Sequence, residues 1–260
     1  MASLSEGRSI WSYRNLIFTI AWTDLKSRYR STSLGFLWSL LEPLLIFSVL
    51  YVVFTHLFGN RTENYPLYLF LGVIMWHMFA KISGAGLHSI VNKGSIVGKI
   101  YLPTEVFVLS SSLASFINVT LEIGVFFIFM VALQFIPPIT ALLFPLVVLL
   151  ELVLAVGISF PLSVFFVFYR DLEYVWSVIT FSGFYFTPVF YDASSLPASV
   201  QPIFLYNPVA GLMTLGRALT LGTTIPPFDQ LIFPLVVPFA VLGIGYAIFR
   251  HLSSRIAEEL

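Results

Sequence analysis

The stretch NKGSIVGKIYLP, residues 92–103, places two glycines and a lysine in an order close to that of a nucleotide-binding loop. A P-loop needs G-x-x-x-x-G-K-[ST], in which backbone N–H groups surround the phosphates and the last hydroxyl holds magnesium. Here only three residues separate Gly94 from Gly98, and Ile100 stands where the hydroxyl is needed. A P-loop also joins a strand to a helix in an α/β domain, which the sequence does not predict. We therefore expect this chain to bind no ATP and no cofactor.

Motifs for metal or hydrolytic chemistry are also missing from the sequence. H-E-x-x-H and G-x-S-x-G do not occur, and there is no cysteine to supply a thiolate ligand or a disulfide. The four histidines are scattered along the chain. The sequence thus predicts no metal site and no catalytic residue.

Ionisable side chains within apolar stretches are the stronger candidates for function, because a charge in lipid is costly unless it is paired or hydrated. Lys81, Glu122 and Glu151 lie inside such stretches. They form either a substrate or proton pathway, or a structural pair between helices that joins Lys81 to one glutamate; we favour the pair. Glu42, directly before Pro43, is a candidate for the cytoplasmic mouth.

Two groups of aromatic residues suggest another kind of chemistry, since flat rings stack on the apolar faces of sugars. The alternative is that the rings face lipid or form interfacial belts, and the residues alone favour this alternative. The first group recurs at roughly helical spacing and the second clusters in a later apolar stretch: Trp38, Phe47, Tyr51 and Phe54, then Phe181, Phe184, Tyr185 and Tyr191.

Membrane helices are the elements that must position these residues. The 260-residue chain is 58% hydrophobic and 10% charged, whereas soluble domains carry roughly 25% charged residues. A helix needs about 20 apolar residues to cross the hydrocarbon. The sequence predicts an all-α integral membrane protein, a single domain over 1–260. Its six spans are predicted at 34–58, 67–87, 104–135, 141–168, 174–191 and 231–250.

The basic residues predict the orientation of these spans. Ten of the thirteen Lys and Arg residues lie outside the spans on the side of the N-terminus, against Arg61 and Arg217 on the other side. The positive-inside rule then places both termini and residues 92–103 in the cytoplasm. Acidic and basic residues are equal in number, which gives no reason to expect nucleic-acid binding.

Two further segments are predicted not to span. Residues 10–30 have polar side chains on one helical face and apolar ones on the other, which predicts an amphipathic helix at the cytoplasmic interface. This helix is either a simple anchor or also a contact for a partner. Residues 192–230 are predicted to form two short helices that dip into the outer leaflet, with a break at Asn207-Pro208. They form either a re-entrant lid or a structural plug.

Several stretches in order along the chain resemble the permease subunit of ABC-2 type exporters, specifically the group that exports polysaccharides such as O-antigen, capsule and teichoic acid. The stretches are SRYRSTSLGFLWSLLEPLL (27–45), LFLGVIMWHMF (69–79), SIVNKGSIVGKIYLP (89–103), VFYRDLEYVW (167–176), FYFTPVFY (184–191) and Tyr206-Asn207-Pro208.

The resemblance implies a homodimer in the cytoplasmic membrane that works with two copies of a separate ATPase subunit and exports a lipid-linked glycan. It implies that helix 10–30 rests on the ATPase and that residues 89–100 form the segment that couples to it, with Asn92, Lys93, Gly94, Gly98 and Lys99. It also implies outer gate helices within 192–230, which include Tyr206, Asn207 and Pro208, and a channel lined by the eight aromatic residues named above.

The pair Arg170-Asp171 at the inner end of the fourth span has two interpretations. It is either a local structural feature, which we favour, or it fixes the depth of the span against the ATPase. Alternatives for the whole chain also remain. They are an ABC-2 exporter of drugs or other lipids, a proton-coupled transporter that uses Glu122 and Glu151, and, more weakly, a membrane glycosyltransferase.

Overall fold

The computed structural model is helical, with no strand among the residues that it describes, which are 10–29, 33–57, 64–93, 102–192, 197, 199, 204 and 206–253. The prediction of an all-α protein is confirmed. Short helical turns at Ile10–Tyr13, Gly35–Leu37, Val53–Leu57, Val91–Lys93 and Ile139–Leu143 precede or extend the longer helices. The longer helices are α1 (Arg14–Tyr29), α2 (Trp38–Val52), α3 (Tyr65–His88), α5 (Glu105–Ala132), α6 (Phe144–Phe168), α7 (Leu172–Phe186), α9 (Pro208–Leu221) and α10 (Phe228–Ser253).

Within the described residues, five helical segments are long and apolar enough to cross a membrane. They correspond to the first, second, third, fourth and sixth predicted spans. They are Trp38–Thr55, Tyr65–His88, Glu105–Ala132, Ile139–Phe168 and Gln230–Ser253.

The fifth predicted span, 174–191, is shorter in the structure. It forms α7, which has 15 residues and a length of about 22 Å at 1.5 Å per residue, less than the ~30 Å of hydrocarbon. The helix ends because Thr187 precedes Pro188, whose ring disfavours a helical conformation in the residue before it. Thr187 is accordingly extended, with φ −106° and ψ 141°.

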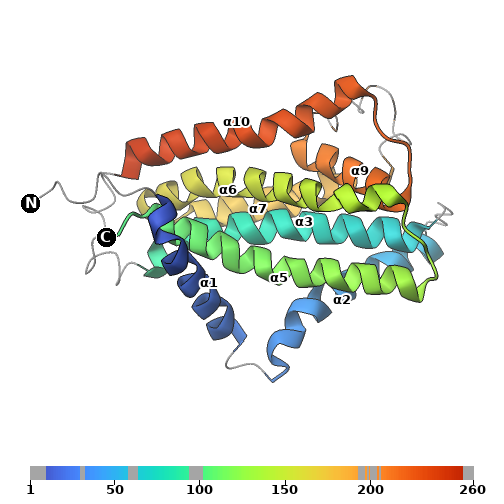
Figure 1. Cartoon of the computed structure of the whole chain (residues 1–260), viewed down its shortest axis with the longest axis horizontal. Helices are drawn as coiled ribbons and strands as arrows, with labels where there is room; N and C mark the ends of the chain where they lie inside the picture. Colours follow the sequence, from blue (N-terminus) through green and yellow to red (C-terminus); the bar gives the residue numbers. More distant parts are fainter. Residues whose placement is uncertain are drawn as a thin grey trace, which may run out of the picture.

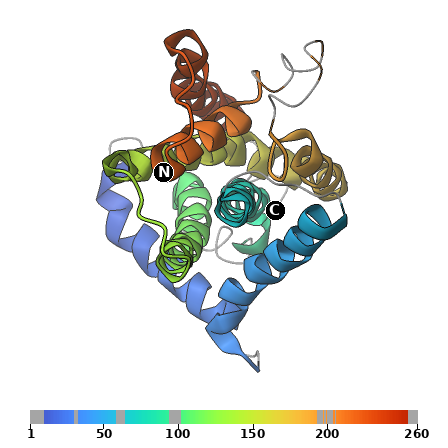
Figure 2. The same cartoon turned by 90° about the vertical axis from the view of Figure 1, so that its right-hand side faces the viewer.

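Helix α3 is the centre of the bundle. Figure 2 shows it nearly end-on, with the other helices around it. In the apolar window of α3, 72% of the residues are buried, against 17% in α2 and 17% in α10. In Figure 1, α1 and α5 begin at the end of the molecule where α6 and α10 finish. We call this the inner end, following the basic residues, and the opposite end the outer end.

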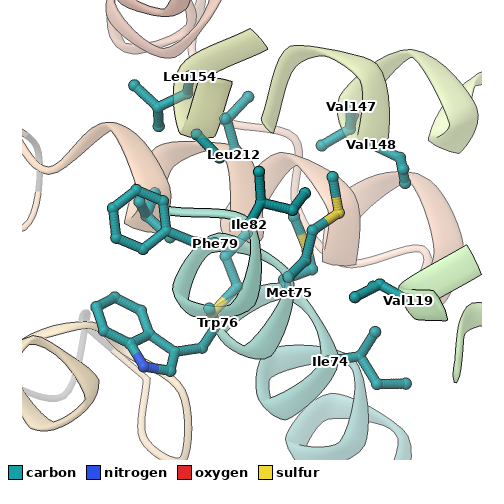
Figure 3. Close-up of a cluster of buried hydrophobic side chains, with 14 of the residues drawn as sticks. Ile74, Met75, Trp76, Phe79, Ile82, Val119, Val147, Val148, Leu154 and Leu212 are labelled. Atoms are coloured by element: carbon teal, nitrogen blue, oxygen red, sulfur yellow. The ribbon is translucent and has the colours of Figure 1, made fainter. Parts of the chain in front are cut away.

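The core forms around the outer two-thirds of α3. Figure 3 shows Ile74, Met75 and Ile82 of α3 converging with side chains of three neighbouring helices, among them Val119 of α5 and Leu212 of α9. Trp76 points to another side, and its indole lies against Gly183 of α7, where an added Cβ would be 2.6 Å from the ring. Burial of these side chains, worth roughly 1.5–3 kcal/mol each in water, contributes less in lipid, so close packing is the more important term here.

The closest backbone approach in this packing joins α6 to α10. A Cβ on Gly157 would lie 2.6 Å from the backbone nitrogen of Leu242, and one on Gly245 would overlap the carbonyl oxygen of Gly157. Membrane helices use small residues in this way because their association depends on van der Waals contact. The two glycines therefore set the distance between α6 and α10.

We expect Gly245→Ala to destabilise the protein, because the new methyl group meets the backbone of α6. Overpacking of this kind costs about 1–3 kcal/mol. Gly243→Ala is the matched control, since a Cβ there has no neighbour within 4 Å and alanine favours a helix by up to about 1 kcal/mol. Thermal unfolding of the two purified variants in detergent measures the difference. Equal melting temperatures would contradict the packing interpretation.

Candidate functional site

Polar side chains gather at three levels along the bundle, and the first lies at the inner end. Lys93 follows α3 in the turn Val91–Lys93, and its ammonium group pairs with Asp24 of α1 at 2.5 Å. It also donates to the hydroxyls of Ser110 and Ser111 of α5, at 3.3 and 3.2 Å. We call these four residues the inner polar cluster. It joins α1, α5 and the end of α3 beside the predicted coupling segment.

The predicted coupling residues are therefore of different kinds. Asn92 is exposed, whereas the side chain of Lys93 is 11% exposed and directed at α1 and α5. The Lys93 side chain is therefore bound within the bundle, at the end where the basic residues gather. The remaining predicted coupling residues, Gly94, Gly98 and Lys99, lie outside the described residues.

Arg170 and Asp171 lie at the inner end, between α6 and α7, and both are exposed. The described part of the chain contains no ion pair between them. The guanidinium of Arg170 instead lies over the ring of Phe166, 5.3 Å from its centroid. Nearby, His88 of α3 lies 3.7 Å from the carboxylate of Glu173 of α7, which links the inner ends of these two helices.

The second level is a charge cluster of four side chains, Glu42, His77, Lys81 and Glu122. Lys81 lies 2.9 Å from Glu122 of α5 and 3.1 Å from Glu42 of α2. His77, one turn away on α3, has its two ring nitrogens 3.3 Å from Glu122 and 3.7 Å from Glu42. The predicted pair between Lys81 and a glutamate is confirmed, and the glutamate is Glu122.

The two carboxylates of the charge cluster differ in exposure. The side chain of Glu122 is fully buried, whereas that of Glu42 is 52% exposed. A buried carboxylate needs its partners, because an unpaired charge there is strongly unfavourable. Lys81 and His77 therefore hold α3 against α5 through Glu122, and hold α2 to this pair through Glu42.

Glu151, the other predicted partner of Lys81, is separate from the cluster. It is buried in α6, and neither carboxyl oxygen has a hydrogen-bond partner in the described part of the protein. The two glutamates of the predicted pathway thus have different surroundings. Glu122 is held by two bases, and Glu151 is enclosed without one.

The third level is an arginine site at the outer end. Arg217 of α9 is 2% exposed, and its guanidinium donates to the carbonyl oxygens of Tyr68, Pro188 and Val189 at 2.6–3.2 Å. It also lies 3.4 Å from the centroid of the Tyr68 ring. Burial lowers the pKa of this guanidinium, and the carbonyl dipoles and the ring replace the water that it loses.

Two local features place Arg217 there. Asn207 caps α9 by accepting hydrogen bonds from the amides of Val209 and Ala210, and Pro208 follows in the first turn, where proline is favoured. The predicted break at Asn207-Pro208 is thus the start of α9. Gly72 of α3 leaves the space for the guanidinium, since a Cβ there would overlap it.

The outer arginine site is extended by hydrogen bonds to the segment after α7. Tyr65 and Tyr68 donate to the carbonyls of Phe190 and Tyr191 at 3.0 and 2.9 Å. Asn207 donates to the hydroxyl of Thr187 at 3.0 Å. Tyr206, the other predicted gate residue, is 73% exposed. Residues 187–191 are therefore held between α3 and α9.

The predicted channel aromatics fall on different faces. Trp38, Phe181 and Tyr185 are exposed. Phe47 lies on the opposite face of α2 from Trp38, is 7% exposed and packs on the rings of Phe70 and Phe129. Phe47 therefore belongs to the core of this chain and does not present its ring to a channel. The other four rings are partly buried: Tyr51, Phe54, Phe184 and Tyr191.

Sequence reasoning missed His77 and Arg217 as site residues. His77 and Lys81 are four residues apart, which puts them on one helical face, and this spacing was an available signal. Arg217 was counted only as an outer basic residue. It is the one charged residue in α9, and a single charge in an apolar helix is itself a signal of an internal partner.

The profile of the ABC-2 type transporter family matches residues 15–221, most of the chain. The chain belongs to this family. It is 28% identical to the O-antigen export system permease protein RfbA of Myxococcus xanthus, over 97% of this chain and 98% of that protein. It is 29% identical to the RfbA protein of Klebsiella pneumoniae, over 95% of each chain. It is 22% identical to the polysialic acid transport protein KpsM of Escherichia coli, over 87% of this chain and 89% of that protein.

As a member of the ABC-2 family, the chain is a transporter permease and not an enzyme. The inner polar cluster, the charge cluster and the outer arginine site therefore lie at successive levels of a transporter permease, from its inner end to its outer end.

We expect Arg217→Lys to destabilise the outer end of the permease. A lysine ammonium lacks the planar fork that reaches three carbonyls, and each buried acceptor left unpaired costs about 1–3 kcal/mol. Arg250→Lys, at an exposed position of α10, is the matched control and should change stability by about 0.5 kcal/mol or less. Hydrogen exchange of the amides of Thr187 and 189–191 reports the local effect. Unchanged exchange in Arg217→Lys would show that the guanidinium does not hold this segment.

Proposed function

We propose that the chain is the permease subunit of an ATP-driven ABC exporter that moves a lipid-linked polysaccharide outward across the cytoplasmic (inner) membrane. The observation that carries the proposal is the nearly full-length similarity to permeases named for O-antigen export. More distant relatives named for polysialic acid and capsule polysaccharide support the same class of substrate. Because the sequence lacks a P-loop, the proposal assigns ATP hydrolysis to a separate subunit.

The working assembly in this proposal is a homodimer of the permease with two copies of the ATPase. The properties of helix α7 are evidence for a neighbouring protein. The helix is too short to cross the hydrocarbon alone, and none of its residues is buried in this chain. With residues 187–191 it forms the fifth of the six proposed crossings. Its exposed apolar side chains then face the second copy or the transported glycan, and they include Val175, Val178, Phe181 and Tyr185.

The inner end is the proposed docking region for the ATPase, and both termini lie on this cytoplasmic side. The coupling segment 89–100 contacts the ATPase, and the helix at 10–30 rests on it at the membrane interface. The inner polar cluster gives this contact a route into the membrane, because Lys93 joins the coupling segment to α1 and α5. Arg170 and Asp171, exposed at the same end, are available to the ATPase.

At the outer end, we assign residues 192–230 to a gate region in the outer leaflet. The support is that α9 is largely buried, lies against α3, α6 and α10, and starts at the Asn207-Pro208 break. The outer arginine site holds α9 to the bundle. Any gating movement is therefore expected in the parts of 192–230 that Arg217 does not hold.

Binding and ATPase measurements on the complex of this chain with its partner ATPase test the proposal. The probe is the lipid-linked glycan extracted from cells of the source strain that lack the permease. We expect it to stimulate ATP hydrolysis severalfold in nanodiscs, since substrate binding and hydrolysis are coupled. Stimulation by amphipathic drugs or by phospholipids, but not by the glycan, would favour the alternative exporter. A pH gradient that drives export without ATP would favour a proton-coupled transporter.

We expect Lys93→Met to lower the amount of glycan exported per ATP hydrolysed, with hydrolysis itself retained. The substitution leaves Asp24, Ser110 and Ser111 without their shared donor, so movement of the coupling segment reaches α1 and α5 less directly. Lys26→Met removes the same charge from an exposed position of α1 and should leave the ratio unchanged. The double variant Lys93→Asp with Asp24→Lys should restore part of it. A wild-type ratio in Lys93→Met would contradict the assignment.

A further inference from the structure

Glu42 is the one member of the charge cluster whose side chain is exposed on the surface of a single chain. It lies in the first half of α2, a helix long and apolar enough to cross the membrane, and its side chain is 52% exposed. The three other members of the charge cluster are covered: the side chains of His77, Lys81 and Glu122 are 15%, 16% and 0% exposed. The cluster thus presents one carboxylate, and no cation, to its surroundings.

The position of this carboxylate is fixed by the cluster. Lys81 and His77 approach its two oxygens at 3.1 and 3.7 Å, and both bases are fixed in turn by Glu122. A carboxylate accepts about four hydrogen bonds, so acceptor sites remain on the exposed side of Glu42. The arrangement is a preorganised acceptor rather than a mobile surface glutamate.

The surroundings of Glu42 must be hydrated or polar. Ionisable side chains in membrane segments face the bundle interior or a water-filled cavity, because exposure to hydrocarbon is strongly unfavourable. Glu42 faces outward from this chain, so the hydrated space lies outside it. Leu45 and Val49 follow Glu42 on the same exposed face of α2 and should border the same space.

The chemistry of the site selects the ligand class. Both oxygens of Glu42 face a base, and Lys81 is shared with Glu122, so the unfilled acceptor sites of Glu42 disfavour anions and suit hydrogen-bond donors. Neutral hydroxyl groups are donors of this kind. Trp38, one turn before Glu42 on the same face and 43% exposed, supplies an aromatic ring next to this acceptor. A ring beside a fixed carboxylate suits a sugar, which offers an apolar face and hydroxyl donors.

We propose that Trp38 and Glu42 form a glycan-contact site that borders a water-filled space on the exposed face of α2, with Lys81 and His77 as its positioning residues. This inference rests on the proposed function, and it names a part of the permease that the sugar touches along its path.

Single-cysteine labelling tests the hydrated face, and the permease is suited to it because it has no cysteine of its own. The complex with its ATPase is reconstituted in nanodiscs and treated, during ATP turnover, with a water-soluble maleimide. We expect Leu45→Cys and Val49→Cys to react at least tenfold faster than Ile128→Cys. Ile128 is the control because it is also exposed, on α5, and lies about as far beyond Glu122 as Val49 lies beyond Glu42. Equal, slow labelling at all three positions would overturn the hydrated face.

Binding of the glycan tests the contact itself, with the lipid-linked glycan extracted from permease-deficient cells as the probe. We expect Glu42→Gln and Trp38→Ala each to weaken binding about tenfold, Ile128→Ala to bind as the wild type does, and bound glycan to slow labelling of Leu45→Cys. Trp38 lies outside the charge cluster, so its variant tests the site without disturbing the ion pairs.

The outcomes separate this inference from the proposed function. Wild-type affinity in both Glu42→Gln and Trp38→Ala, together with glycan binding by the wild-type complex, overturns the contact site alone. A wild-type complex that does not bind the glycan overturns the proposed function and the site with it. Weaker binding by Glu42→Gln with unprotected Leu45→Cys assigns Glu42 to helix packing and also overturns the site.

Discussion

The enclosure of α3 is the constraint on which the rest of the structure depends. A helix surrounded by other helices has no water for its polar groups, so each one must be paired inside the protein. The bases on α3 account for the glutamates that face it from α2 and α5. The backbone of α3 also receives the guanidinium of Arg217, which binds the carbonyl of Tyr68 and occupies the space beside Gly72. The charge cluster and the outer arginine site are thus both consequences of the burial of α3.

Peripheral helices contrast with this centre. The windows of α2 and α10 are each 17% buried, and α7 buries no residue completely. Helix α2 is joined to the bundle through Glu42 and Phe47, whereas α10 packs along α6 and also contacts α9. The exposed faces of these outer helices are left for lipid or for a neighbouring protein.

Part of the charge cluster was predictable, because an unpaired charged side chain in lipid has a high free energy. A lysine and a glutamate within apolar stretches have to be paired, and this reasoning led to Lys81 and Glu122. It did not distinguish Glu122 from Glu151, because the choice depends on which face of α6 meets α3. The family resemblance assigned Lys93 to the coupling segment, but only the position of α1 shows that its ammonium group is turned towards Asp24. Trp38 and Phe47 were both predicted to line a channel, because they belong to one series of aromatic residues at roughly helical spacing. Only the packing of α2 shows that Phe47 lies in the core and Trp38 on the surface.

The helical class, the long spans and the break at Asn207-Pro208 were predictable from the sequence, because hydropathy, charge distribution and proline positions add up along the chain. The family was recognised separately, from motifs that resemble those of its members. The tertiary structure alone decided that α7 stops at 15 residues, that Arg217 is buried, and that Glu42 is the exposed member of a four-residue cluster. Ion pairs and exposed faces depend on which helices are neighbours and at what rotation, and no local sequence pattern contains that information.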